Sequence, residues 1–277
     1  MWVGMDSVVV IGLGEVGRAI YHILKNSMKF DVYGYDTDPS KTVNKYDEIP
    51  HPADFLHIAF PYTNEFIDIV YGYVEHFKPN MIIVHSTVAP GTTRKIFQKT
   101  GLPTVFSPVR GKHPNLVKHL YFWPKWLASL PLDRIERAAH HLSLAGFKVR
   151  IYAGPPETVE LAKLWETVYR AIMIASWHEI HRIARIYKAE IEAIAEFVGE
   201  VHEILGDRPI YYPDYIGGHC LIPNTKMLRD AYSSKLFEFV LESNELRLKE
   251  LDCNNIREEI EKVKKIALRF INKEYYT

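Results

Sequence analysis

Short apolar runs and longer amphipathic stretches alternate through the first half of the chain. Successive apolar residues, as in Ile82-Ile83-Val84, are typical of strands buried on both faces of a sheet. Strands are predicted at residues 7–11, 31–35, 55–60, 81–85, 104–107 and 148–152, with helices between several of them, for example at residues 64–77 and 132–145. This alternation predicts an α/β fold with a doubly wound parallel sheet and helices on both of its faces.

The pattern changes near Gly154-Pro155-Pro156. From residue 157 to residue 187 the apolar positions follow helical spacing without a glycine or proline. At about 1.5 Å per residue this predicts a helix roughly 45 Å long, which would join two domains or build a dimer interface. We expect a sheet domain at residues 1–153 and an all-helical domain at residues 154–277. Further helices are predicted at residues 190–205, 233–251 and 254–272, with a Gly/Pro/Tyr-rich loop at residues 206–223.

Composition narrows the function classes. The net charge is +0 and no apolar run reaches about 18 residues, so nothing favours nucleic-acid binding, membrane binding or a membrane span. The two cysteines, Cys220 and Cys253, are too few for a disulfide framework. The first residues lack the pattern of a signal peptide. We expect a cytoplasmic protein that acts on a small molecule.

A glycine motif follows the first predicted strand. It reads Gly12-Leu-Gly14-Glu15-Val16-Gly17 and opens onto a helix-like segment. In a dinucleotide-binding turn the first glycine allows the tight turn, the second lets the backbone approach the pyrophosphate, and the third lets helix and strand lie close. Asp36, at the end of the next strand, would accept hydrogen bonds from the ribose 2′-OH and repel a 2′-phosphate. The motif therefore predicts a Rossmann domain at residues 1–153 that binds NAD rather than NADP; the alternative is a glycine turn in an unrelated α/β domain.

Four further motifs occur in order along the chain: His85-Ser86-Thr87-Val-Ala-Pro-Gly91-Thr-Thr, Ser107-Pro108, Glu160-Leu-Ala-Lys163-Leu, and Gly217-Gly-His-Cys220-Leu, followed by Asn224-Thr-Lys226. With the glycine motif they resemble the UDP-glucose/GDP-mannose dehydrogenase family, and the resemblance covers nearly the whole chain. The family oxidises a nucleotide-sugar alcohol to a carboxylate with two NAD. The resemblance adds Pro61, Ser86 and Thr87 to the expected NAD contacts Gly12, Gly14, Glu15, Val16, Gly17 and Asp36.

The resemblance also implies catalytic roles. Cys220 is expected to attack an aldehyde, giving a thiohemiacetal and then a thioester. Lys163 is expected to stabilise the developing oxyanion. Thr87, Thr167 and Asn224 are expected to hold the water that hydrolyses the thioester. The alternative for Cys220 is a small buried apolar residue, and the alternative for Lys163 is a solvated helix residue.

Several positions depart from the family pattern. Val109 stands where the family has a glutamate, Thr167 where it has an asparagine, and Asn224 where it has an aspartate. The chain is also expected to lack the family's C-terminal domain, which binds the nucleotide. His113, between Lys112 and Pro114, is a candidate substitute base because an imidazole titrates near neutral pH; the alternative is a solvated basic loop.

Three functions remain open on the sequence. The first is an NAD-dependent dehydrogenase acting on a sugar or nucleotide-sugar alcohol, with two or four electrons removed. The second is a two-electron dehydrogenase of a small hydroxy acid, like the related β-hydroxyacid dehydrogenases. The third is a non-catalytic NAD-binding regulator. The long helix at residues 157–187 is expected to form a homodimer. His178 and His181 lack a third ligand, so no metal site is predicted.

Overall fold

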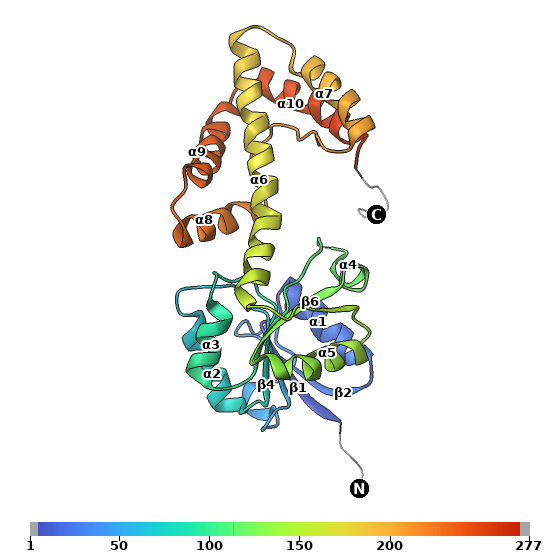
Figure 1. Ribbon diagram of the computed structural model, residues 1–277, viewed down its shortest axis with the longest axis vertical. Helices are drawn as coiled ribbons and strands as arrows, with labels where there is room; N and C mark the ends of the chain where they lie inside the picture. The colour runs from blue at the N-terminus through green and yellow to red at the C-terminus, as the bar shows by residue number, and fades with distance from the viewer. Residues whose placement is uncertain (1–4, 113, 272–277) are drawn as a thin grey trace. The chain divides into compact units, whose positions relative to one another are not determined.

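The chain divides into two compact units, Met1–Lys163 and Leu164–Thr277. The structure is a computed structural model and describes residues 5–112 and 114–271 (Figure 1). The division falls inside the long helix α6 (Pro156–Ile186), whereas the sequence pattern suggested a boundary at residues 153–154. Each unit is described below by itself.

The first unit is built on one sheet. In the described residues seven strands occur in the spatial order β2-β1-β3-β4-β5-β6-β7. Their bounds are β1 Asp6–Ile11, β2 Phe30–Tyr35, β3 Phe55–Ile58, β4 Met81–Val84, β5 Thr104–Phe106, β6 Lys125–Leu130 and β7 Val149–Ile151. Neighbouring strands run parallel except for β5 and β6, which are antiparallel. The α/β fold predicted from the sequence is thus present, with one antiparallel pair within the sheet.

Strand β6 was missed by the sequence prediction. It lies between Pro124 and Pro131 and begins with Lys125, a residue type that rarely starts a buried strand. The structure nevertheless buries the Lys125 side chain. The aromatic residues around Pro124 suggested only a core segment, so the antiparallel turn of the sheet did not emerge from the pattern.

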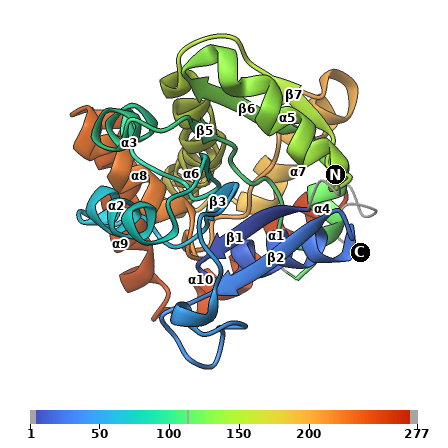
Figure 2. The ribbon, with the colours of Figure 1, turned by 90° about the horizontal axis from the view of Figure 1, so that it is seen from below.

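Helices cover both faces of this sheet, because successive residues of β1 are apolar and point to opposite faces. Val8 and Val10 belong to one core with α1 (Glu15–Asn26), α4 (Leu116–Phe122) and α5 (Ile135–Leu144). Val9 and Ile11 belong to the other core with α2 (Phe66–Phe77) and α3 (Thr92–Thr100). Figure 2 shows the sheet between these two helical layers. Short 3-10 turns lie at Tyr46–Glu48 and Leu132–Arg134.

The second unit is helical. It contains most of α6, followed by α7 (Ile191–Leu205), α8 (Leu221–Ala231), α9 (Lys235–Glu250) and α10 (Asn254–Ala267). Helix α10 contacts α7, and α8 contacts α9. The predicted loop at residues 206–223 ends at Cys220, because Leu221 already begins α8. Within the part of the chain that is described, no helix is long and apolar enough to cross a membrane.

Candidate functional site

The glycine turn after β1 has the geometry that a dinucleotide requires. Gly12 has φ +85°, and a Cβ there would lie 2.7 Å from the backbone nitrogen of Phe60. A Cβ on Gly17 would lie 1.6 Å from the carbonyl oxygen of Gly12, so α1 can approach the turn only with glycine at this position. At Gly14, by contrast, a Cβ would meet no described atom within 4 Å. The turn is therefore tight inside and open at Gly14, where α1 begins and its first N–H groups can meet phosphates.

Asp36 is fixed beside this turn. Its Oδ2 accepts a hydrogen bond of 2.6 Å from the backbone N–H of Leu13, and its Oδ1 accepts one of 2.8 Å from Asp38. An ionised carboxylate has about four acceptor positions, so two backbone bonds leave room for ribose hydroxyls. The bond to Leu13 joins the end of β2 to the glycine turn, and the sequence did not reveal it.

The other expected cofactor contacts follow neighbouring strands. Strand β3 lies beside β1 in the sheet. The helix that follows β1 and the helix that follows β3 lie on opposite faces of the sheet. In open α/β sheets, ligands bind at the carboxyl ends of two such strands. Pro61 follows β3, and Ser86 and Thr87 follow β4. The Ser86 hydroxyl donates a 2.6 Å hydrogen bond to the Phe60 carbonyl, which ties these two segments together.

Three buried histidines, from β3, the residue after β4 and α5, form a row of ring-to-ring contacts. His85 Nε2 is 2.8 Å from His57 Nδ1, and His57 Nε2 is 2.9 Å from His141 Nε2. Burial lowers the pKa of His57 and His85 well below the ordinary value and that of His141 to about 3. The rings are therefore neutral near pH 7. Sequence reasoning missed this row, because its members lie in three separate segments: β3, the residue after β4, and α5.

A buried lysine adjoins the row. Lys125 Nζ donates hydrogen bonds to the carbonyl oxygens of Ser107 (2.6 Å) and Pro108 (3.2 Å), and it lies 3.0 Å from His85 Nδ1. Burial lowers the pKa of Lys125 well below its ordinary range. Its role in the structure is to hold the Ser107-Pro108 backbone, one of the motifs of the family pattern.

In the second unit, three expected catalytic residues are linked. Cys220 is exposed and lies at the N-cap of α8, unlike the buried thiol that was the alternative. The backbone N–H of Asn224 donates to the Cys220 carbonyl at 2.9 Å. The Asn224 side-chain amide donates to the Thr167 hydroxyl at 2.8 Å, and this hydroxyl donates to the Leu164 carbonyl. Thr167 and Asn224, which both differ from the family pattern, thus form one neutral hydrogen-bonded pair between α6 and α8, the helix that Cys220 caps.

Lys163 and His113 are the remaining residues for which a catalytic role is expected. Lys163 is half-buried on α6. His113 lies outside the described residues. The neighbouring Arg110 donates a 2.6 Å hydrogen bond to the Pro124 carbonyl and lies 4.8 Å from the centre of the Trp123 ring. Arg110 therefore supports the local loop.

His178 and His181 have structural partners. His178 Nε2 lies 2.6 Å from the Asp214 carbonyl, and His181 Nε2 lies 2.6 Å from a Glu259 carboxylate oxygen. Burial lowers the pKa of both imidazoles, that of His178 to about 4. Across residues 5–112 and 114–271, no group of three or more His, Cys, Asp or Glu side chains is arranged to hold a metal ion.

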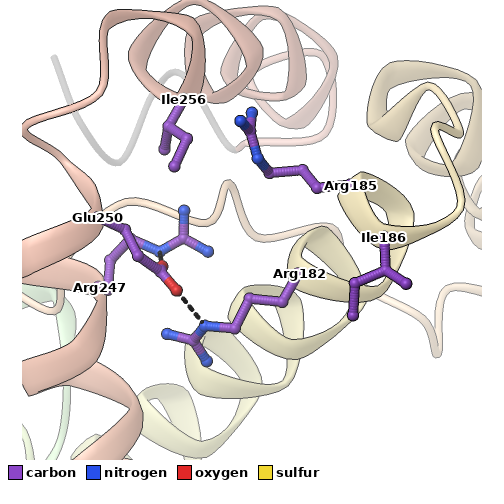
Figure 3. A pocket seen from close by; sticks show the side chains of 6 residues that line it. All are labelled: Arg182, Arg185, Ile186, Arg247, Glu250 and Ile256. Carbon is purple, nitrogen blue, oxygen red and sulfur yellow. Dashed lines mark hydrogen bonds and ion pairs between the residues drawn. The ribbon is translucent and has the colours of Figure 1, made fainter.

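A pocket in the second unit is lined by ion pairs. Figure 3 shows its lining residues Arg182, Arg185, Ile186, Arg247, Glu250 and Ile256. Glu250 faces both Arg182 (2.7 Å) and Arg247 (3.1 Å), while Arg185 pairs with Glu259 at 2.8 Å. Because each guanidinium already faces a carboxylate, the pocket belongs to the framework that joins α6, α9 and α10. None of the expected catalytic residues that the structure describes lines it.

Comparisons with known proteins give further evidence. Residues 157–246 match the central domain of the UDP-glucose/GDP-mannose dehydrogenase family. UDP-N-acetyl-D-mannosamine dehydrogenase of Methanocaldococcus jannaschii is 27% identical over 266 residues, a match that takes in 77% of this chain and 59% of that protein. The chain thus spans less than two thirds of the length of this curated relative.

Solved structures show the same fold. The UDP-D-ManNAc dehydrogenase of Pyrococcus horikoshii superposes with a TM-score of 0.73 at 20% identity, over 86% of this chain and 68% of that one. The 3-hydroxyisobutyrate dehydrogenase of Mycobacterium tuberculosis gives a TM-score of 0.65 at 15% identity, over 95% of this chain and 99% of that one.

The sheet order and the glycine turn define the first unit as a Rossmann-type domain, followed by a helical unit. The matched stretch contains Lys163, Thr167, Cys220 and Asn224. The chain is thus similar to the UDP-glucose/GDP-mannose dehydrogenase family, whose central domain its residues 157–246 match.

Proposed function

We propose that this chain is an NAD-dependent dehydrogenase that oxidises an alcohol of a nucleotide-sugar substrate. The observation that carries the proposal is the central-domain match, because residues 157–246 include the lysine and the cysteine that the family pattern requires. The relative from Methanocaldococcus jannaschii is named for a UDP-N-acetyl sugar, which makes such sugars the first substrates to test.

The first unit would hold NAD. The glycine turn Gly12–Gly17 and the N-terminus of α1 suit the pyrophosphate, since the turn is open at Gly14. The carboxylate of Asp36 would accept the ribose hydroxyls. Pro61, Ser86 and Thr87 would line the next strand ends. NAD supplies a hydride acceptor when it is bound.

Lys163, Cys220 and the polar residues are assigned separate tasks. The thiolate of Cys220 would add to the aldehyde carbon of the oxidised substrate, and the N-terminal end of α8 favours negative charge on its sulfur. Lys163 would donate to the substrate oxygen as it gains negative charge. Thr87, Thr167 and Asn224 would hold the water that attacks the thioester, and His113 would take a proton from it.

The test is NADH formation with a panel of UDP- and GDP-sugars, comparing the wild type with Cys220→Ala. Turnover of a nucleotide sugar that yields the carboxylate in the wild type and is lost in the variant would support the covalent four-electron route. An unchanged yield of carboxylate in Cys220→Ala would rule out the thioester step.

A second function rests on a different observation. The 3-hydroxyisobutyrate dehydrogenase of Mycobacterium tuberculosis matches this chain over nearly the whole length of both. A two-electron dehydrogenase of small hydroxy acids would need no thiol. Turnover confined to small hydroxy acids and unchanged in Cys220→Ala would favour this second function.

A further inference from the structure

Glu160 is a fully buried carboxylate in the first turns of α6, and no role has yet been assigned to it. Its Oε2 accepts a hydrogen bond of 2.6 Å from the backbone N–H of Gly91. Its Oε1 accepts bonds from the backbone N–H of Thr93 (2.8 Å) and from the Thr93 hydroxyl (2.6 Å). All three donors belong to the start of α3. A carboxylate so placed joins two elements that lie far apart in the sequence.

The contact replaces a missing helix cap. The N-cap of α3 is Gly91, which has φ +87° and no side chain to accept from the first N–H groups of the helix. The carboxylate of Glu160 supplies that acceptor, and its negative charge also suits the positive end of the helix dipole. One turn earlier on α6, Glu157 forms an ion pair with Arg94 at 2.6 Å at the surface. Two carboxylates of α6 therefore hold the start of α3, one buried and one exposed.

The segment between β4 and α3 is held at both ends. It begins with His85 and Ser86, where the Ser86 hydroxyl is bonded to the Phe60 carbonyl. It ends at Gly91, where Glu160 is bonded. Thr87 lies between these two anchors. Glu160 and Lys163 are three residues apart on α6, so their side chains leave the same face of the helix.

We propose that Glu160 is a positioning residue that fixes Thr87 relative to Lys163. The inference rests on the roles assigned to Thr87 and Lys163 under the proposed function. Fixing the Gly91 end of the loop to α6 sets the distance between the loop that carries Thr87 and the helix turn that carries Lys163. All of these residues belong to the first unit.

The chemistry of the contact requires a carboxylate. An ionised carboxylate only accepts hydrogen bonds, whereas a glutamine amide would direct N–H donors at one of the backbone N–H groups. Burial raises the pKa of Glu160, and the hydrogen bonds from Thr93 and Gly91 oppose that rise. Glu160→Gln is therefore nearly the same size as the native residue but reverses one contact.

The experiment compares Glu160→Gln with the matched control Glu157→Gln, which removes the exposed ion pair between the same two helices. Two milder variants, Thr93→Val and Thr93→Ser, remove or keep the hydroxyl donor. For each protein, kcat and KM for a turned-over nucleotide sugar, the Kd of NAD and the thermal unfolding midpoint are measured. Lys163 is also labelled with limiting acetic anhydride, and its acylation rate is read by peptide mass spectrometry.

We expect Glu160→Gln to lower kcat by about 100-fold, since a misplacement of roughly 1 Å at a reacting group has that effect. The Kd of NAD should change little. The acylation rate of Lys163 should change several-fold in Glu160→Gln and stay unchanged in Glu157→Gln. Thr93→Val should lower kcat in the same direction by a smaller factor, and Thr93→Ser should restore it.

A purely structural cap gives a different result. Glu160→Gln would then lower the unfolding midpoint but leave both kcat of the folded protein and the acylation of Lys163 at wild-type values, and the proposal would be overturned. An equal loss of kcat in Glu157→Gln would overturn it as well. A wild type that turns over no nucleotide sugar would refute the proposed function, while Lys163 acylation would still decide the role of Glu160.

Discussion

At the scale of single residues, the site differs from the UDP-glucose/GDP-mannose dehydrogenase pattern in losing a charge at Asn224. Thr167 and Asn224 form a hydrogen-bonded neutral pair where the family pattern has an asparagine and an aspartate. Neither a hydroxyl nor an amide is a good general base near pH 7. Under the proposed function the only base is then His113, and hydrolysis of a Cys220 thioester would be the slow step.

Restoring the carboxylate should speed this step. Asn224→Asp is expected to raise the rate of thioester hydrolysis by roughly 100-fold, the lower end of the range in which a positioned base contributes. Burst kinetics would show it: the wild type should give a rapid phase of NADH formation and a slow steady state, and the variant a faster steady state. Asn224→Ala serves as the control, because it breaks the bond to Thr167 without adding a base. If the alanine variant accelerates equally, the carboxylate is not the cause.

The buried histidines make the first unit sensitive to acid. Because burial lowers the folded-state pKa of His57, His85 and His141, the unfolded chain binds more protons than the folded chain below about pH 6.5. The free energy of unfolding should therefore fall as the pH drops below that value. His141, whose pKa falls from 6.5 to about 3 in the folded chain, accounts for an upper limit of about 5 kcal/mol of this loss at about 1.4 kcal/mol per pKa unit.

His141→Phe should reduce this acid sensitivity. The ring would lie against Phe55, whose centroid is now 3.8 Å from that of His141. At pH 7 the variant should lose about 1–2 kcal/mol, because His57 Nε2 loses its partner. Denaturant unfolding at a series of pH values measures both effects. An unaltered slope in His141→Phe would show that this ring does not titrate as described.

At the scale of elements, the glycine turn shows which features a sequence can predict. The motif spacing predicted its place between β1 and α1, and the structure gives a separate geometric reason at Gly12, Gly14 and Gly17. The partners that hold the site were not predictable, since Glu160 bonds to Thr93 across 67 residues and His57 to His141 across 84. Periodicity reports which residues of one element share a face, and not which distant side chain meets them.

Two glycine variants should separate the fold from cofactor binding. Gly17→Ala should destabilise the first unit by about 3 kcal/mol, because its Cβ would overlap the Gly12 carbonyl. Gly14→Ala should fold normally, since its Cβ enters open space, but should weaken NAD binding by blocking the backbone's approach to the pyrophosphate. Thermal unfolding and NAD titration by fluorescence measure the two effects. Wild-type affinity in Gly14→Ala would argue against binding at this turn.

Strand β6 also could not be predicted from the sequence. The other six described strands lie within two residues of the places at which they were predicted. Strand β6 instead starts with a lysine whose ammonium finds its acceptors in Ser107 and Pro108, on another segment. A buried amine of this sort depends on tertiary partners, so it cannot be predicted from the local sequence.

At the scale of the whole molecule, α6 carries a row of exposed apolar side chains. Leu161, Trp165 and Tyr169 follow one another at intervals of four residues and are 46%, 46% and 51% exposed. Apolar side chains at this spacing form one stripe along a helix. We propose that this stripe is the surface through which the homodimer expected from the sequence would form.

Trp165→Asp should therefore shift the protein toward monomer by at least about tenfold in dissociation constant, since a central aromatic contact is often worth about 2 kcal/mol. Sedimentation velocity over a range of concentrations measures the shift. Phe197→Asp is the control, because Phe197 is 72% exposed on α7 and lies outside the stripe. Equal sedimentation of wild type and Trp165→Asp would place any self-association elsewhere.

The histidine row also constrains how such a chain can evolve. Each neutral ring donates from one nitrogen and accepts at the other, so the three rings must share one direction. Among the described residues, His141 Nδ1 ends the row without a partner. Replacing one histidine leaves its neighbour's ring nitrogen buried without a hydrogen-bond partner. Replacing all three leaves no such unpaired nitrogen, so the effects of the substitutions are not additive. Homologues should then carry these histidines as a set or lack them as a set, and intermediate sequences should be rare.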